Sequence, residues 1–151
     1  MQVQEIMTRD PVCCTRETRI EEVARMMRER DCGGIPVVLN ADDRIPLGMV
    51  TDRDIVVRTL AHGQNPLGVT AGQVMTSPVV TVTAGESLED CSRKLEENQV
   101  RRAPVVDGKG RCCGIVAQAD LARRAPAPMT AEVVRSVSRP PGGAERDDGA
   151  F

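Results

Sequence analysis

Apolar residues in the first half of the chain follow three successive patterns. A short extended run at 12–15 comes first, and a stripe at i, i+3, i+4 and i+7 spacing follows, made of Ile20, Val23, Ala24 and Met27. This spacing places the stripe on one face of an amphipathic helix. The β-branched run at 35–39 then predicts a strand, and a second strand follows a polar turn and leads into another helix. The first unit is therefore predicted to be β-α-β-β-α.

The second half of the chain repeats this order. When the sequence is shifted by 68 residues, residues 7–38 align with 75–106, and ten of these 32 positions are identical. The repeated helix carries Leu88, Cys91 and Leu95 on its apolar face. After a shorter turn the offset becomes 66, and Gly48, Val50, Asp54 and Arg58 match Gly114, Val116, Asp120 and Arg124. The period is too long for a solenoid repeat and indicates one small domain that is duplicated.

The duplication predicts an α+β architecture in which two copies are related by pseudo-twofold symmetry. We expect the first domain at 3–60 and the second at 73–125, joined by a Gly- and Pro-containing linker at 61–72. A short C-terminal helix or extension is expected at 126–139. The Pro-, Gly- and charge-rich tail at 140–151 is expected to be disordered.

Polar residues mark the predicted helix ends. Thr18 with Glu21, Ser87 with Asp90, and Thr51 with Asp54 each have capping-box spacing. His62 precedes Gly63 at a predicted helix C-terminus, where a histidine is favourable.

The most informative motif lies where the last strand of each copy enters a helix. It reads Gly-Met-Val-Thr-Asp-Arg-Asp at 48–54 and Gly-Ile-Val-Ala-Gln-Ala-Asp at 114–120. Together with the Ile-Met-Thr and Val-Met-Thr starts and the two Pro-Val-Val runs, this motif resembles the CBS domain family. The resemblance covers about residues 3–125 in two successive copies. It implies small sheets packed on two helices in each copy, and a homodimer in which apolar helical faces meet.

The resemblance also implies a site for an adenosine-containing ligand in the cleft between the copies. AMP, ADP, ATP and S-adenosylmethionine are the expected regulatory ligands, with no obligatory cofactor. A carboxylate accepts hydrogen bonds from both ribose hydroxyls, and helix-start amides or arginines receive phosphate. Carried over by position, the first site comprises Thr51, Asp54, Gly34, Ile35, Arg53 and Val80. The second comprises Asp120, Arg102, Ala103, Arg101 and Val12.

Ala117 stands where the motif has threonine, so the second copy departs from the pattern. The missing hydroxyl removes a hydrogen bond worth about 0.5–1.5 kcal/mol, which is expected to weaken the second site about tenfold. Capping alone would explain Thr51 and Asp54 without a ligand. Asp120, however, is retained although Ala117 cannot cap, and this favours a ligand-binding role.

Composition and charge exclude several classes. The net charge is −2, and the chain has no Trp, no Tyr and a single Phe. A nucleic-acid partner is therefore not expected, because neither a basic surface nor stacking aromatics are available. No apolar stretch approaches the roughly 18 residues of a membrane span, and no signal peptide precedes the first unit, so we expect a cytoplasmic location.

We expect no catalytic activity, because no nucleophile with an adjacent general base can be assigned around the single histidine, His62. Of the six cysteines, four form the adjacent pairs Cys13-Cys14 and Cys112-Cys113, and none has zinc-site spacing, so we expect no metal. One cysteine of each pair should be buried, because neighbours on a strand face opposite ways.

The expected function is a regulatory ligand sensor, not an enzyme, that acts on an unidentified partner protein. Two alternatives stay open. One is a structural homodimer or protein-interaction module without a ligand. The other is a cysteine-based redox or metal sensor.

Overall fold

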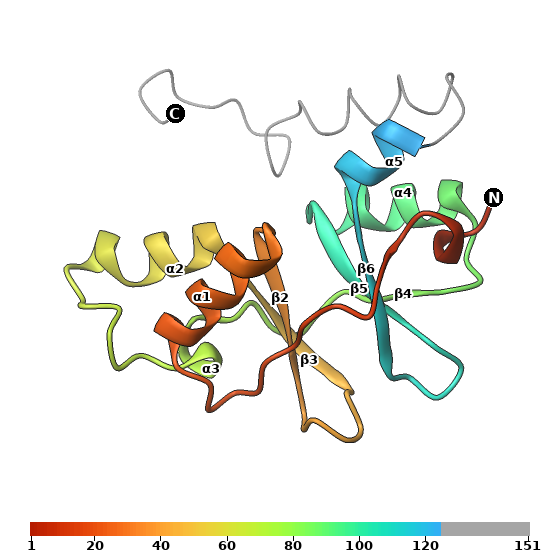
Figure 1. Cartoon of the computed structure of the whole chain (residues 1–151). Helices are drawn as coiled ribbons and strands as arrows, with labels where there is room; N and C mark the ends of the chain where they lie inside the picture. Colours follow the sequence, from red (N-terminus) through yellow and green to blue (C-terminus); the bar gives the residue numbers. More distant parts are fainter. Residues whose placement is uncertain (125–151) are drawn as a thin grey trace, which may run out of the picture.

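A computed structural model of the chain describes residues 1–124, so the expected extension at 126–139 and tail at 140–151 lie outside the described residues. Two α/β units lie side by side (Figure 1). In chain order the elements are η1 (Val3–Glu5), β1 (Thr8–Arg9), α1 (Ile20–Arg30), β2 (Gly34–Val38), β3 (Pro46–Thr51), α2 (Asp52–Arg58), η2 (Leu60–His62), α3 (Ala71–Val74), β4 (Val82–Thr83), α4 (Leu88–Glu97), β5 (Arg102–Val106), β6 (Cys112–Ala117) and α5 (Gln118–Arg124).

The first copy is built on an antiparallel hairpin of β2 and β3. The strand expected at 12–15 is wrong, because only Cys14 pairs there, in a parallel bridge to Val37. Helix α1 buries Ile20, Val23 and Met27 as predicted. The fourth member of the predicted stripe, Ala24, is exposed.

The second copy contributes β6, β5 and β4 to a four-stranded sheet in the order β1-β6-β5-β4. Strand β4 runs parallel to β5, and the other pairs are antiparallel. All three predicted apolar residues of α4, Leu88, Cys91 and Leu95, are buried. The α+β prediction with tandem β and α elements is confirmed.

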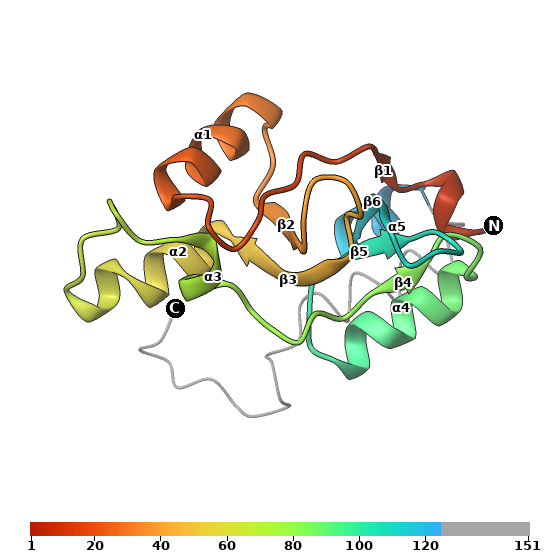
Figure 2. The same cartoon turned by 90° about the horizontal axis from the view of Figure 1, so that it is seen from below.

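The two copies exchange their leading segments. Strand β1, at the start of the first copy, pairs with β6 of the second, with Thr8 opposite Ile115. Thr76, at the start of the second copy, forms the equivalent bridge to Met49 in β3. Figure 2 shows the N-terminal segment running along the second unit before it crosses to α1. Each sheet is therefore completed by the other copy.

The hydrophobic cores follow the same exchange. Val3, Ile6 and Met7 are buried with the second copy's α4 and sheet. Val69, Ala71 and Val74 are buried with α1 and β2 of the first copy. The end of the segment predicted as a linker, 61–72, thus packs in the first core.

Gly48 and Gly114 permit the close approach of the exchanged segments. A Cβ on Gly48 would lie 2.7 Å from Met75 Sδ and 2.9 Å from the Thr76 carbonyl oxygen. A Cβ on Gly114 would lie 2.5 Å from Met7 Sδ. Two of the glycines that mark the repeated motif are therefore required by packing between the copies.

The helix-end predictions have mixed outcomes. Thr51 and Asp54 form a complete capping box, and the Ser87 side chain accepts from the Asp90 amide. The capping box predicted for Thr18 is wrong, because Arg19 is the N-cap of α1 and the Thr18 hydroxyl instead accepts from the Thr15 amide. His62 ends η2, and Gly63 follows in the left-handed conformation, as predicted. Within residues 1–124 no helix is long and apolar enough to cross a membrane.

Candidate functional site

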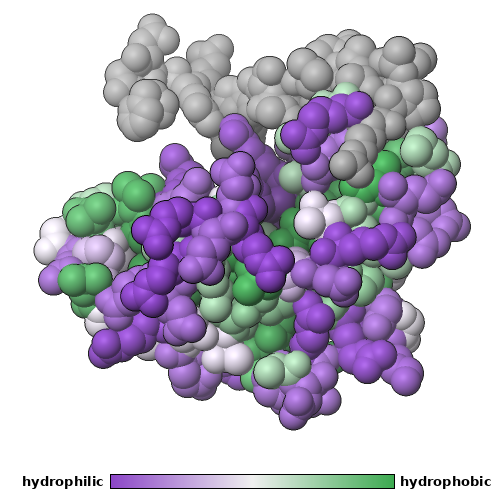
Figure 3. All heavy atoms as spheres, in the orientation of Figure 1, coloured by the Kyte–Doolittle hydropathy of each residue, from purple (hydrophilic) through white to green (hydrophobic). Residues whose placement is uncertain are grey.

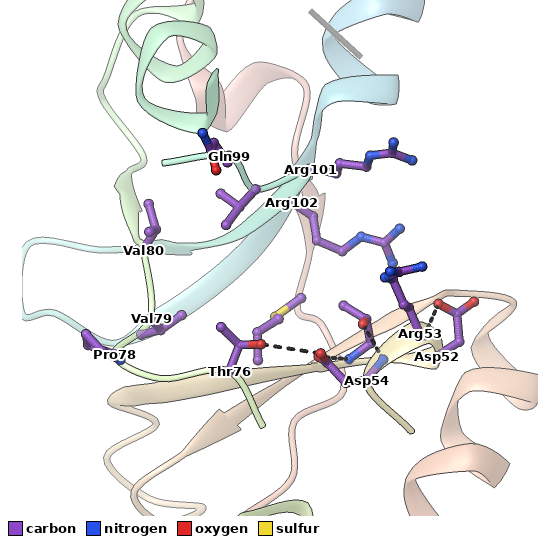
Figure 4. A pocket seen from close by; sticks show the side chains of 13 residues that line it. Asp52, Arg53, Asp54, Thr76, Pro78, Val79, Val80, Gln99, Arg101 and Arg102 are labelled. Atoms are coloured by element: carbon purple, nitrogen blue, oxygen red, sulfur yellow. Dashed lines mark hydrogen bonds between the residues drawn. The ribbon is translucent and has the colours of Figure 1, made fainter. Parts of the chain in front are cut away.

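A cleft of about 460 Å³ lies between the two copies. One side is the β3–α2 junction of the first copy, which the sequence singled out. The other side is formed by two segments of the second copy, at 76–80 and 99–102. The cleft is lined by Met49, Thr51, Asp52, Arg53, Asp54, Thr76, Pro78, Val79, Val80, Gln99, Val100, Arg101 and Arg102 (Figure 4).

Asp54 divides its two carboxylate oxygens between the fold and the cleft. Asp54 Oδ2 accepts the Thr51 amide at 2.9 Å, while the Thr51 hydroxyl accepts the Asp54 amide at 3.1 Å. Asp54 Oδ1 has only long contacts, to the Thr76 hydroxyl at 3.4 Å and to Arg58 Nε at 3.7 Å. One oxygen is therefore held by the capping box, and the other is weakly engaged.

Three arginines supply positive charge to the cleft. Arg53 comes from the first turn of α2, and Arg101 and Arg102 come from the start of β5. Within residues 1–124 none of the three forms an ion pair with a carboxylate. Figure 4 shows their side chains on the side of the cleft opposite Pro78, Val79 and Val80. The cleft thus has a cationic side and an apolar side, with Asp54 between them.

Arg102 also connects the copies. A Cβ on Gly34 would lie 2.7 Å from Arg102 Cδ, and one on Gly33 would lie 2.8 Å from Arg102 Nη1. The side chain of Arg102 therefore reaches from the second copy onto the Gly33–Gly34 backbone of the first. A larger residue at either position would displace it.

The structure brings four of the six residues predicted for the first site to this cleft: Thr51, Arg53, Asp54 and Val80. Gly34 and Ile35 are buried in β2 and do not line it. Arg101 and Arg102, assigned by sequence to the second site, line the first cleft instead. The other predicted second-site residues, Asp120, Ala103 and Val12, are not part of it, and Ala103 is fully buried in the second core.

Asp120 is more tightly occupied than Asp54. Its Oδ2 accepts the Ala117 amide at 3.0 Å, and its Oδ1 is 2.6 Å from Arg123 Nη2. Asp120 thus still caps α5 without a threonine. The retention of Asp120 therefore gives no separate argument for a ligand, since capping and an ion pair account for both oxygens.

Sequence reasoning missed several lining residues. Thr76 belongs to the Val-Met-Thr start of the second copy, which served to define the repeat but not the site. Pro78, Val79, Gln99 and Val100 carry no chemical signature, and their place in the cleft follows from the strand exchange. The signal for Thr76 is its place in the repeated Met-Thr start, which pairs with the motif strand of the other copy.

The adjacent cysteines behave as predicted, with Cys14 and Cys112 buried and Cys13 and Cys113 partly exposed. Burial raises the pKa of Cys14 and of Cys91 to about 12. No group of three or more His, Cys, Asp or Glu side chains that could hold a metal ion occurs within residues 1–124.

Comparison with known proteins places the whole described chain in one family. The family model described as "CBS domain" matches residues 3–59 and 71–127. Hypoxic response protein 1 of Mycobacterium tuberculosis is 36% identical over 137 residues, which is 91% of this chain and 94% of that protein. A crystal structure of this relative, described as having two coordinated zinc ions, has a TM-score of 0.72 and 37% identity over 83% of this chain and 100% of the other.

Two further relatives bear on function. A crystal structure of CBSX2 in complex with AMP has a TM-score of 0.67 and 26% identity, over 82% of this chain and 95% of the other. Inosine-5'-monophosphate dehydrogenase of Streptococcus pyogenes is 30% identical over 113 residues, but the match spans only 22% of that enzyme. The match is to the CBS part of the dehydrogenase, not to the rest of the enzyme. The chain therefore belongs to the CBS domain family as a pair of CBS domains, a regulatory rather than a catalytic module.

Proposed function

We propose that this CBS pair is a regulatory sensor that binds an adenosine-containing nucleotide in the cleft lined by Asp54. The observation that carries the proposal is the convergence, on one cleft between the copies, of a weakly engaged carboxylate oxygen and three guanidinium groups that have no carboxylate partner within residues 1–124. A nucleotide presents ribose hydroxyls, which need an acceptor, and phosphates, which need cations. The AMP complex of a related CBS pair supports this ligand class.

Each part of the ligand has a matching surface. Asp54 Oδ1 accepts hydrogen bonds from the ribose hydroxyls, which replace its long contacts with Thr76 and Arg58. Arg53, Arg101 and Arg102 receive the phosphates, and the Thr51 hydroxyl lies beside them. Adenine packs on Val79, Val80 and Met49, since no aromatic residue is present to stack on it.

Binding regulates only when the ligand prefers one arrangement of the two copies over another. The cleft supports a regulatory role, because its two sides come from different copies and a ligand in it would touch both. The regulated partner is then a protein that recognises the relative position of the copies.

The test is calorimetric titration of the full chain with AMP, ADP, ATP and S-adenosylmethionine. Binding by at least one of them, with a raised melting temperature, is expected. Asp54→Asn keeps an oxygen for the Thr51 amide but places an amide donor toward the ribose, so it should lose affinity while remaining folded. Asp120→Asn is the matched control in the other copy and should leave the first cleft intact. Failure of all four ligands to bind or to shift the melt would contradict the proposal.

We also propose that the chain forms a homodimer through an apolar patch on the first copy, defined as Val56, Val57, Leu60 and Leu67. These residues are 52%, 39%, 59% and 63% exposed although they lie within one short stretch around α2 and η2. An open groove beside Leu67 has both apolar and charged lining residues: Ile20, Ala24, Ile55 and Pro66, and Glu21, Arg25 and Arg28. Figure 3 shows apolar surface at the end of the molecule that contains α2. Exposed apolar side chains gathered at one end of a molecule are typical of an association site.

Sedimentation of single variants tests the dimer. Leu60→Glu should shift the chain toward monomer, because a charge would be buried at the patch. Leu39→Glu is the control, since Leu39 is 47% exposed but lies outside the patch. A monomeric unsubstituted chain, or equal effects of both variants, would overturn the assignment of the patch.

A further inference from the structure

Cys13, Arg44 and Cys112 meet at a second contact between the copies, which the proposed function does not use. Cys13 precedes α1, Arg44 lies in the turn between β2 and β3, and Cys112 begins β6 of the second copy. Arg44 Nη2 donates to the Pro11 carbonyl oxygen at 3.0 Å and lies 3.4 Å from Cys13 Sγ. The Arg44 carbonyl oxygen accepts the Cys112 amide at 2.8 Å. Arg44 therefore holds both cysteines.

Cys13 and Cys112 are 99 positions apart in the chain, yet Arg44 brings them together, with its Nη2 3.4 Å from Cys13 Sγ and its carbonyl oxygen 2.8 Å from the Cys112 amide nitrogen. The Cys112 thiol lies 3.6 Å from the Gly114 carbonyl oxygen, to which it donates. A hydrogen bond with the Cys112 side chain is also the main cause that lowers the pKa of Cys13 to about 6, with Arg44 acting in the same direction against burial. The pKa of Cys112 is raised by the same hydrogen bond and by burial. The pair is thus asymmetric, with a thiolate at Cys13 and a thiol at Cys112 near neutral pH.

Exposure distinguishes the two residues as well. Cys13 is partly exposed, whereas Cys112 is 3% exposed. A small oxidant therefore reaches Cys13 before Cys112. A thiolate with a second thiol beside it is the arrangement expected of a cysteine pair that reacts with peroxide and then closes.

We propose that Cys13 and Cys112 are a peroxide-reactive pair that closes to a disulfide between the two CBS domains. The Cys13 thiolate attacks one oxygen of a peroxide, the O–O bond breaks, and an S–O bond forms, giving a sulfenic acid and releasing an alcohol or water after proton uptake. Cys112 sulfur then attacks Cys13 sulfur, an S–S bond forms, and the sulfenic oxygen leaves as water with the Cys112 proton. The peroxide is reduced by two electrons, and the two thiols together are oxidised by two.

A metal site is the competing use of two adjacent thiols. Zinc takes four ligands in a structural site and three protein ligands in a catalytic one. Within residues 1–124 no third His, Cys, Asp or Glu joins these two cysteines to form such a group. The geometry therefore favours a bond between the sulfurs over shared coordination.

The experiment treats the reduced full chain with equimolar hydrogen peroxide, blocks remaining thiols with N-ethylmaleimide, and maps tryptic peptides without reduction. Free thiols should fall from six to four, and peptides 10–16 and 112–123 should be linked. Dithiothreitol should restore six thiols. The linked species should be monomeric on non-reducing gels, because the bond lies within one chain.

Each of these peptides contains adjacent cysteines, so variants must identify the pair. The double variant Cys14→Ser, Cys113→Ser should still form the linked peptide with unchanged yield. Cys13→Ser and Cys112→Ala should each abolish it, and circular dichroism melts of both variants test whether they remain folded. The proposal is overturned if the link persists in either variant, if it joins two chains, or if Cys13 proceeds to sulfinic acid with Cys112 still free. Zinc retained by the untreated protein and lost in both variants would also overturn it, in favour of a metal site.

Discussion

Arg53 and Arg102 enter the candidate cleft from different copies, and neither has a carboxylate partner within residues 1–124. Unpaired guanidinium groups of this kind are available for phosphate, to which they bind in a bidentate manner. This availability distinguishes them from Arg123, which is already 2.6 Å from Asp120.

We therefore predict that Arg53→Met and Arg102→Met each lower the affinity for AMP or ATP. Loss of one charge-assisted hydrogen bond of about 1.5–3 kcal/mol corresponds to roughly 10–100-fold. Adenosine, which has no phosphate, should bind the variants and the unsubstituted chain equally. Arg30→Met, at the exposed end of α1, is the control. Isothermal titration measures these affinities. If a variant loses as much affinity for adenosine as for AMP or ATP, its arginine has a structural role and does not bind phosphate.

Cys13 should react with iodoacetamide in a pH-dependent way that Cys113 does not share. The thiolate is the reactive form, so a pKa lowered to about 6 predicts that the rate rises as pH increases through 6 and levels off above neutrality. The groups that face it are Cys112 and Arg44, with Asp10 acting on Arg44. Cys113, whose pKa is raised by burial, is the internal comparison.

In the Arg44→Met variant the midpoint for Cys13 should move upward, because one hydrogen bond and one positive charge are removed. The measurement is mass spectrometry of samples quenched at several times at each pH, which gives the alkylation rates of Cys13 and Cys113 together. A Cys13 rate that keeps climbing up to pH 9 would show an ordinary thiol and leave Arg44 without this role.

Among the elements, α2 and α5 form a natural pair for testing helix capping. The third residue of each helix is an aspartate that accepts the amide of the residue just before the helix, but only α2 has a threonine at that position to complete the box. Thr51→Ala should therefore cost about 0.5–2 kcal/mol of unfolding free energy, and Ala117→Thr should add stability of comparable size. Urea unfolding measures both. The two changes in unfolding free energy should have opposite signs. If both variants are destabilised, position 117 cannot accept a side chain larger than that of alanine.

The glycines of β3 and β6 make a second element-scale prediction. Gly48→Ala should destabilise the chain by about 1–3 kcal/mol, because the added methyl meets Met75 Sδ and the Thr76 carbonyl oxygen. Gly114→Ala should behave alike through Met7 and the Thr8 carbonyl oxygen. A Cβ on Gly85 meets nothing within 4 Å, so Gly85→Ala is the control. The melting temperatures of the three variants provide the comparison.

Elements that depend on local periodicity can be predicted from the sequence. Contacts that depend on the exchange of leading segments between the copies cannot. The stripes of α1 and α4 followed from spacing, and the Thr51–Asp54 box followed from its residues. The repeat showed which segments resemble each other but not which copy each one joins. For this reason the sequence does not assign Thr76 or Arg102 to the first cleft, although Thr76 belongs to a repeated motif and Arg102 to the predicted second site. Ala24 fits the apolar spacing, yet it lies beside an open groove where nothing in the described chain covers it.

For the whole molecule, the exchange predicts that the two halves remain together when the chain is cut. Fragments 1–63 and 64–151, divided at the exposed loop after Gly63, should co-elute when produced together, because each carries buried residues of the other's core. Removing residues 1–9 from the first fragment should weaken co-elution, since Val3, Ile6 and Met7 are then missing from the second core while Val69, Ala71 and Val74 still pack in the first. Size-exclusion chromatography provides the measurement. Independent, separately folded halves would contradict the exchange.

The place of Val3, Ile6 and Met7 in the second core has a consequence during protein synthesis. Their partner strand β6 is made about a hundred residues later, which at 5–20 residues per second is a delay on the order of 5–20 seconds. Throughout that interval the ribosome-bound chain presents three apolar side chains that have nowhere to pack. The segment that contains Val3, Ile6 and Met7 is therefore available to nascent-chain chaperones until the second copy has been made.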